Sequence, residues 1–151
     1  MNFIVGKDGT AAIKPEFVSQ IFIVTYSSGE VKVIVVNNSE FNGFGTTLGT
    51  FNDSDKTTNL TEAKAYLAEL VKKLDKSFIV GQDGTVAIKP EFIAQVDVFK
   101  NSKGETEVIT INHSGLQTTL ATFNSGDIEA DSETAKAYFA ELVKILNGGG
   151  E

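Results

Sequence analysis

Short runs of β-branched and aromatic residues fill the first third of the chain, and glycine, proline, serine or asparagine bounds each run. Such runs indicate β-strands, because these side chains pack well on a pleated surface and the bounding residues favour turns. The segment Gly6-Lys7-Asp8-Gly9 indicates a hairpin turn, since glycine adopts positive φ without a steric penalty. Strands are predicted at residues 3–5, 10–13, 20–26, 31–37 and 46–51.

A helical period follows these strands. Apolar side chains recur at spacings of three and four over residues 61–74, which places them on one face of an α-helix. Asn59 precedes this stripe, and Glu62 lies three residues later, so we predict an N-cap and its capping-box partner. Antiparallel strands followed by one amphipathic helix predict the α+β class.

The whole pattern occurs twice. Residues 3–39 match residues 78–114 at 21 of 37 positions, and residues 46–74 match residues 118–146 at 17 of 29. We therefore predict a tandem duplication of a unit with four to five antiparallel strands and one C-terminal helix. The predicted copies are 1–75 and 76–147, with a flexible glycine-rich tail at 148–151. Each copy is near the lower size limit for an independent core, so the copies are expected to pack as a pseudo-twofold fused dimer.

Differences between the copies indicate an outer sheet face. Phe22 of the first copy becomes Asp97 in the second, and Tyr26 becomes Asn101. A contiguous apolar face of this kind marks an interface, formed with the other copy, with a second chain or with a different macromolecule. A loop with two aromatics, absent from the second copy, is a further candidate contact. The predicted interaction surface consists of Phe22, Val24, Tyr26, Val33, Val35, Phe41 and Phe44.

Composition and charge remove several classes of function. The 151 residues include no cysteine and no arginine, with 13 lysines against 20 acidic residues and a net charge of −7. The absence of cysteine excludes disulfides, thiolate metal sites and cysteine nucleophiles. No apolar run reaches the roughly 20 residues that span a bilayer, and the N-terminus lacks the pattern of a secretory signal. We therefore expect a cytoplasmic protein without a membrane partner.

Catalytic motifs are weak. Asp8-Gly9-Thr10 resembles the end of the Asp-x-Asp-Gly-Thr segment of haloacid-dehalogenase-type phosphatases. Gly6 stands where that family has its nucleophilic carboxylate, so covalent phosphoryl transfer has no starting group here, and a hairpin turn is the preferred interpretation. His113, the only histidine, lies in a predicted loop, and no nucleophile elbow accompanies it. We predict that the protein is not an enzyme.

Metal and cofactor motifs are also incomplete. Asp53 and Asp55 suggest a calcium loop, but Thr58 and Lys64 occupy the positions where such a loop requires glycine and glutamate. Acidic residues ahead of the second helix are predicted to complement the positive end of its dipole. These residues are Asp127, Glu129, Asp131 and Glu133. No cofactor and no metal site are predicted.

The remaining function is binding. We predict a non-enzymatic acidic binding or regulatory protein that engages another protein through its sheet face and loops, since a negative surface speeds association with a basic one. The alternative is a single-stranded nucleic-acid-binding protein in which sheet aromatics such as Phe22 and Tyr26 stack on bases. The net charge of −7 and the lack of arginine oppose this alternative, because phosphate neutralisation dominates such binding.

Overall fold

The computed structural model describes residues 3–37, 45–74, 77–113 and 115–148. The chain forms two compact units. The first contains Met1–Val80 and Gly84–Lys89, and the second contains Gly81–Asp83 and Pro90–Glu151. The units therefore do not follow the boundary of the sequence copies at 75/76, because two strands of the second copy belong to the first unit.

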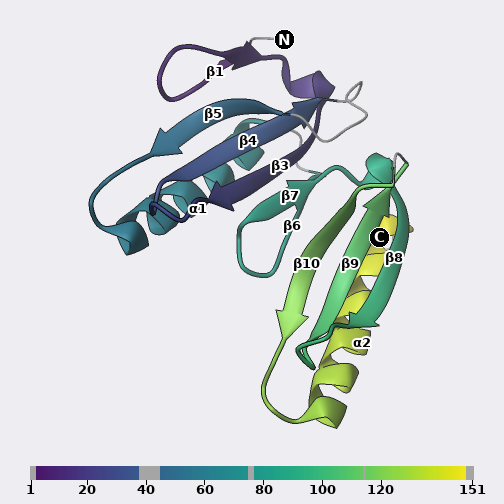
Figure 1. Ribbon diagram of the computed structural model, residues 1–151. Helices are drawn as coiled ribbons and strands as arrows, with labels where there is room; N and C mark the ends of the chain where they lie inside the picture. The colour runs from purple at the N-terminus through teal and green to yellow at the C-terminus, as the bar shows by residue number, and fades with distance from the viewer. Residues whose placement is uncertain (1–2, 38–44, 75–76, 114, 149–151) are drawn as a thin grey trace. The chain divides into compact units, whose positions relative to one another are not determined.

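Both sequence copies have the same order of elements, and every strand pairing is antiparallel (Figure 1). The predicted α+β class is confirmed. The first copy contains β1 (Ile4–Val5), β2 (Ala12–Ile13), the 3-10 helix Pro15–Phe17, β3 (Val18–Thr25), β4 (Val31–Asn37), β5 (Thr46–Phe51) and α1 (Lys56–Lys73). The second contains β6 (Ile79–Val80), β7 (Val86–Ile88), the 3-10 helix Pro90–Phe92, β8 (Ile93–Lys100), β9 (Thr106–Asn112), β10 (Gln117–Phe123) and α2 (Ile128–Leu146).

The turn between β1 and β2 forms as predicted. Gly9 has a φ of +76°, a conformation that side-chain-bearing residues rarely adopt. Asp8 Oδ1 accepts hydrogen bonds from the Thr10 backbone nitrogen at 3.1 Å and from Thr10 Oγ1 at 2.7 Å. Gly84 has a φ of +79° at the corresponding place in the second hairpin. The carboxylate of Asp8 therefore stabilises a turn, as expected for aspartate before glycine.

The first unit contains a five-stranded sheet in the order β5-β4-β3-β7-β6 and a separate two-stranded sheet, β1-β2. The hairpin of the second copy, β6-β7, thus extends the sheet of the first copy on the β3 side (Figure 1). The β1-β2 turn is tied to β5, because the backbone nitrogen of Lys7 donates to the carbonyl oxygen of Leu48 at 2.6 Å.

The strand register fixes the core face of this sheet. Ile21 lies opposite Val35, and Ile23 lies opposite Val33, so these side chains point to the same face. Helix α1 packs on that face and buries it. The buried core consists of Val18, Ile21, Val31, Val33, Val35, Leu48, Phe51, Ala63, Leu67, Leu70, Phe78 and Ala87.

Helix α1 begins at Lys56, five residues before the predicted start. Its N-cap is Asp55, whose side chain accepts from the backbone nitrogens of Thr57 and Thr58 at 3.0 and 3.3 Å. Asn59 lies inside the helix and is fully buried. The predicted pair of Asn59 and Glu62 is therefore wrong as a cap, because Asp55 supplies the same capping chemistry one turn earlier.

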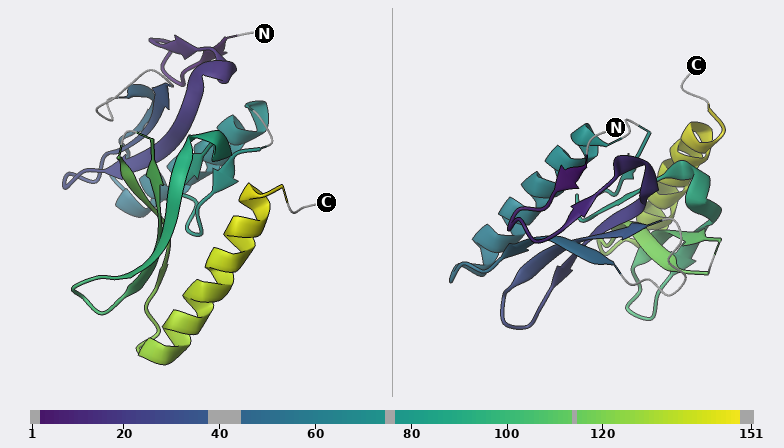
Figure 2. Two further views of the ribbon diagram at one scale, coloured as in Figure 1. Left: turned by 90° about the vertical axis from the view of Figure 1, so that its right-hand side faces the viewer. Right: turned by 90° about the horizontal axis from the view of Figure 1, so that it is seen from above.

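The second unit contains a three-stranded sheet in the order β10-β9-β8, with α2 along one face (Figure 2). Asp127 caps α2 and accepts from the backbone nitrogen of Ala130 at 3.1 Å. Glu129 and Asp131 lie in its first turn, where negative charge favours the helix dipole. Asp131 is buried and binds Ser125, with the Ser125 Oγ donating to Asp131 Oδ1 at 2.7 Å.

The core of the second unit is more polar than that of the first. Thr106 and Thr110 are buried at the positions that Val31 and Val35 occupy in the first copy. Threonine has nearly the shape of valine, so the strand packs in the same way, but the hydroxyl needs a hydrogen-bond partner. Within the described residues, Thr110 Oγ1 is buried without one.

Across the described residues, neither helix combines the length and the apolar character needed to cross a membrane.

Candidate interaction surfaces

Three of the predicted surface residues share the outer face of the first unit's sheet. Phe22 and Val24 alternate with Ile21 and Ile23, so they point away from α1, and both are partly exposed. Tyr26, just beyond β3, is 41% exposed. Lys32 lies opposite Val24, and its Nζ is 5.3 Å from the centroid of the Tyr26 ring. The cation–π contact holds the ring beside the apolar pair.

The other predicted members do not join this face. Val33 and Val35 are 0% and 1% exposed and point to α1, so their assignment to an outer face is wrong. The comparison of the copies was misleading because Thr110 replaces Val35 at a core position rather than at the surface. Phe41 and Phe44 lie outside the described residues, and their role stays a prediction.

The same face of the second unit carries a polar network. Asn101 Nδ2 donates to Glu105 Oε1 at 2.9 Å and to Glu107 Oε2 at 2.6 Å. Thr119 Oγ1 donates to Glu107 Oε1 at 3.2 Å. In the copy alignment, Asn101 and Glu107 replace Tyr26 and Lys32, so a hydrogen-bonded pair stands where the first copy has a cation–π pair. The second unit therefore presents polar groups at the positions of Phe22 and Tyr26, while Phe99, at the position of Val24, is 47% exposed.

The two units also differ at a sheet edge. In the first unit β3 lies between β4 and β7, whereas β8, the same strand of the second copy, is the last strand of its sheet. An edge strand presents a row of backbone groups to which another strand can add. Five of the eight β8 residues are exposed, and they include Val98 at 36% and Phe99 at 47%.

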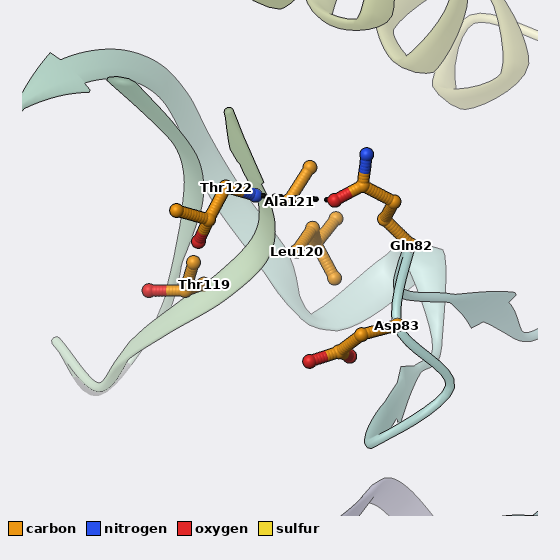
Figure 3. Close-up of a pocket in the computed structure, with 6 residues that line it drawn as sticks. All are labelled: Gln82, Asp83, Thr119, Leu120, Ala121 and Thr122. Carbon is orange, nitrogen blue, oxygen red and sulfur yellow. Dashed lines mark hydrogen bonds between the residues drawn. The ribbon is translucent and has the colours of Figure 1, made fainter. Parts of the chain in front are cut away.

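A small pocket of about 180 Å³ lies between the turn Gly81–Asp83 and β10 (Figure 3). Its lining residues are Gln82, Asp83, Thr119, Leu120, Ala121 and Thr122. Gln82 spans it, since its backbone nitrogen donates to the Leu120 carbonyl at 2.7 Å and its Oε1 accepts from the Thr122 nitrogen at 3.3 Å. The volume is below that of typical organic-ligand sites, and the polar groups join the turn to β10.

A tyrosine packs near each Asp-Gly-Thr turn. Burial raises the pKa of Tyr66 and of Tyr138, and the negative charges of Asp8 and Asp83, respectively, raise these pKa values further. The side-chain and backbone hydrogen bonds from Thr10 hold the pKa of Asp8 below its ordinary value. A carboxylate with a lowered pKa and a phenol with a raised pKa form no activated nucleophile.

His113 is exposed, and its Nε2 lies 3.1 Å from the carbonyl oxygen of Glu91. This contact is to a backbone carbonyl and not to an orienting carboxylate of the kind that a catalytic triad uses. In the part of the chain that the structure describes, no group of three histidine, cysteine, aspartate or glutamate residues is arranged to hold a metal ion.

The β8 edge is the candidate feature that sequence reasoning missed. The strand itself is visible in the sequence, but its position at the end of a sheet depends on where the β6-β7 hairpin pairs. The two hairpins have nearly the same sequence, so local pattern cannot assign different partners to them. The useful signal was the divergence at Asp97, because inward or flanking charges are common on strands that end a sheet.

Neither a protein-family model, nor a curated protein, nor a solved structure matches this chain.

Proposed function

We propose that this chain is a non-enzymatic, acidic binding protein that engages another protein through the outer sheet face of its first unit. The observation that supports this most directly is the apolar strip of Phe22, Val24 and Tyr26. These side chains share one face, and each remains partly exposed. Aromatic residues with a polar tip and a rigid ring are typical of binding sites between proteins.

The contrast between the copies supports the same proposal. Both copies use the same strands, but only the first presents aromatic and aliphatic side chains where the second presents Asp97 and Asn101. A structural requirement of the fold would apply to both copies. The apolar strip is therefore best explained by a partner that meets the first unit alone.

The proposal includes the origin of the molecule by tandem duplication. The shared element order and the two equivalent aromatic pairs support duplication. Phe51 packs edge-on to Tyr66 at 5.9 Å, and Phe123 packs edge-on to Tyr138 at 6.0 Å. The charge divides as −2 on residues 1–75 and −5 on residues 76–151, so a basic partner is attracted chiefly to the second half.

Single-stranded nucleic acid is the second candidate, and the Lys32–Tyr26 pair is the observation that favours it. An exposed ring beside an ammonium group suits a base and its phosphate. One further lysine is engaged elsewhere. Lys89 is 7% exposed, and its Nζ donates to the Glu16 carbonyl oxygen at 3.4 Å. The net charge of −7 further disfavours this candidate.

The test exchanges face residues between the copies. The variant F22D/Y26N places the second copy's residues on β3 and directly after it, at positions where the second copy carries them in and directly after β8. The control T25K also introduces the residue of the second copy, Lys100, but at an exposed position on the opposite face of the sheet. Wild type and both variants are immobilised and challenged with extract from the native host, and retained proteins and nucleic acids are quantified.

The expected result is a specific protein that wild type and T25K retain and that F22D/Y26N loses by at least about tenfold, since burial of one aromatic side chain is worth that much. Equal retention by all three proteins contradicts the proposal. Retention of oligonucleotide by wild type at low salt, lost in F22D/Y26N, reverses the ranking of the two candidates.

A further inference from the structure

The β3 edge of the first unit shows how this fold receives an additional hairpin. Strand β7 runs antiparallel along β3. The backbone nitrogen of Ile23 donates to the Thr85 carbonyl at 2.9 Å, and that of Lys89 donates to the Ser19 carbonyl at 3.0 Å. Phe78, directly before β6, is 7% exposed and belongs to the core of the unit. A hairpin on this edge therefore adds both a strand and an aromatic side chain.

Strand β8 has the same sequence position in the second copy, and no strand formed by the described residues lies on its corresponding edge. The burial of individual residues reflects this difference. Ser19 is 8% exposed, whereas Ala94 at the matching position is exposed. Ile21 is fully buried, whereas Val96 is partly exposed. The greater exposure of β8 is thus what the fold shows when no hairpin is paired to this edge.

The β1-β2 hairpin has the form that this edge accepts. Ile4 lies opposite Ile13 in this hairpin, and Ile79 lies opposite Ile88 in β6-β7. The two hairpins therefore have the same register, with each position shifted by 75 residues. In the described part of the chain, β2 pairs with β1 alone. Phe3 is 57% exposed although Phe78, at the same place in the second copy, is 7% exposed. Likewise Ala12 is exposed, and Ala87 is fully buried.

We propose that the β1-β2 hairpin of a second copy of this chain adds to the β8 edge. The register follows from the first unit, where Gln20, Ile21 and Phe22 lie opposite Ile88, Ala87 and Val86. The intermolecular pairs are then Gln95 with Ile13, Val96 with Ala12, and Asp97 with Ala11. Phe3 of the second copy packs on the second unit as Phe78 packs on the first.

The order of elements along the chain selects a second copy rather than the molecule's own hairpin. The observed pairing joins the hairpin of a later sequence copy to the sheet of the copy before it. The molecule's own β1-β2 hairpin precedes β8 in the chain, so in this order the hairpin that adds to β8 comes from another molecule. The β1-β2 hairpin and the β8 edge belong to different units of the chain, so the contact between two molecules is heterologous and propagates head to tail.

The attachment of the β1-β2 turn to its own unit is compatible with this pairing. Lys7 donates from its backbone nitrogen to the Leu48 carbonyl at 2.6 Å. Gln82, at the same position of the β6-β7 turn, donates to the Leu120 carbonyl at 2.7 Å. That hairpin makes this turn contact while its strand β7 remains paired, so a turn contact does not occupy the outer edge of the second strand.

Disulfide cross-linking tests the register, because the chain contains no cysteine of its own. Phe22 and Val86 form a non-hydrogen-bonded pair between the bonded pairs of the β3-β7 ladder, a geometry close enough for a disulfide. The variants A11C and D97C are mixed and oxidised, with one chain carrying a mass tag. A mixed disulfide between the two is expected. F22C/V86C serves as the intramolecular standard, and A11C mixed with A137C, on the exposed side of α2, serves as the off-site control.

Sedimentation velocity over a concentration series tests the assembly without cysteines. F3A is expected to weaken self-association by roughly ten- to a hundredfold, because a phenylalanine side chain is no longer buried. V5A is the matched control, since Val80 at the same position stays 42% exposed on the paired hairpin. V98P removes the backbone donor that corresponds to Ile23 and is expected to abolish association, whereas V98A keeps that donor and associates.

A mixed A11C–D97C disulfide, with association weakened in F3A and unchanged in V5A, supports the proposal. A wild type that stays monomeric at every concentration overturns it, and so does an A11C/D97C double variant that closes only within one chain. F3A keeps the test decisive if V98P fails to fold. The F22D/Y26N variant concerns a different surface and is expected to self-associate as wild type does, so failure of the proposed function leaves this result intact.

Discussion

Asn59 Nδ2 donates a hydrogen bond to the carbonyl oxygen of Gly29 at 2.9 Å and so joins α1 to the turn between β3 and β4. The same amide binds the loop before the helix, because Nδ2 also donates to the Asp53 carbonyl at 2.9 Å and Oδ1 accepts from the Asp53 nitrogen at 2.7 Å. The second copy has Asp131 at this position, and its carboxylate binds the matching residue Ser125. Asn59 and Asp131 therefore both bind the loop before their helix. The additional bond to the turn between β3 and β4 is a feature of the first unit.

The first prediction concerns this amide. Asn59→Ala leaves three buried or partly buried backbone groups without this partner, and we expect a loss of about 1–3 kcal/mol of unfolding free energy in the first unit. Urea unfolding, with hydrogen exchange to assign the change to one unit, measures this effect. Asn59→Asp keeps the acceptor for the Asp53 nitrogen but not the donors, so an intermediate loss is expected. A loss for Asn59→Asp as large as that for Asn59→Ala contradicts a role for the acceptor.

The second prediction concerns the buried hydroxyl of Thr110. Thr110→Val removes a hydroxyl that has no hydrogen-bond partner and restores the residue found at Val35. We expect the second unit to gain about 1–2 kcal/mol in unfolding free energy. The reciprocal change Val35→Thr introduces a hydroxyl into the apolar core and is expected to destabilise the first unit by a similar amount. Thermal unfolding of both variants checks the pair, and destabilisation by Thr110→Val disproves the assignment.

The third prediction is a pH dependence that originates at Asp55. Hydrogen bonds from Thr58 and Thr57 lower the pKa of Asp55 in the folded state. A folded-state pKa below the unfolded value adds stability above the unfolded pKa of about 3.9, and this stability is lost as the pH falls through the folded value. Asp55→Asn is expected to keep the cap at neutral pH, because asparagine caps as well as aspartate. Unfolding curves between neutral pH and acid should then show a smaller acid loss in Asp55→Asn than in wild type.

The fourth prediction concerns the two partly buried tyrosines. Burial raises the pKa of Tyr66 and of Tyr138 above the ordinary value, so the neutral phenol is favoured in the folded state. Stability from these groups is complete below the unfolded tyrosine pKa of about 10 and is lost as the pH rises through the folded value. Ultraviolet titration of wild type, Tyr66→Phe and Tyr138→Phe resolves the two midpoints. A midpoint at or below about 10 for either phenol contradicts this prediction.

Local sequence pattern predicted the strands and the turns well. The predicted strands at 31–37 and 46–51 coincide with β4 and β5, because β-branched runs bounded by turn residues leave little choice of conformation. The Asp8-Gly9 turn also formed as expected. These features depend on residues that are neighbours in the chain.

The assignment of faces and edges was less predictable. The polar counterpart of Val35 predicts an outward position, yet threonine and valine are nearly isosteric, and Thr110 occupies the same core position. The apolar stripe predicts a late helix start because Lys56, Thr57 and Thr58 interrupt it, although Asp55 already caps the first turn. The pairing of β6-β7 with β3 joins residues more than sixty positions apart, which no local pattern specifies.

The pairing of β7 with β3 also determines when the first sheet is completed during synthesis. When α1 has emerged from the ribosome, all strands of the first sequence copy have been synthesised. The sheet of the first unit still lacks β6 and β7 at that point. Chains emerge at about 5–20 residues per second, so the edge of β3 stays open for roughly a second or more until Ile88 has emerged. The first unit therefore completes its folding only after the first strands of the second copy have been synthesised. A nascent chain that stalls between the copies exposes the unpaired edge of β3.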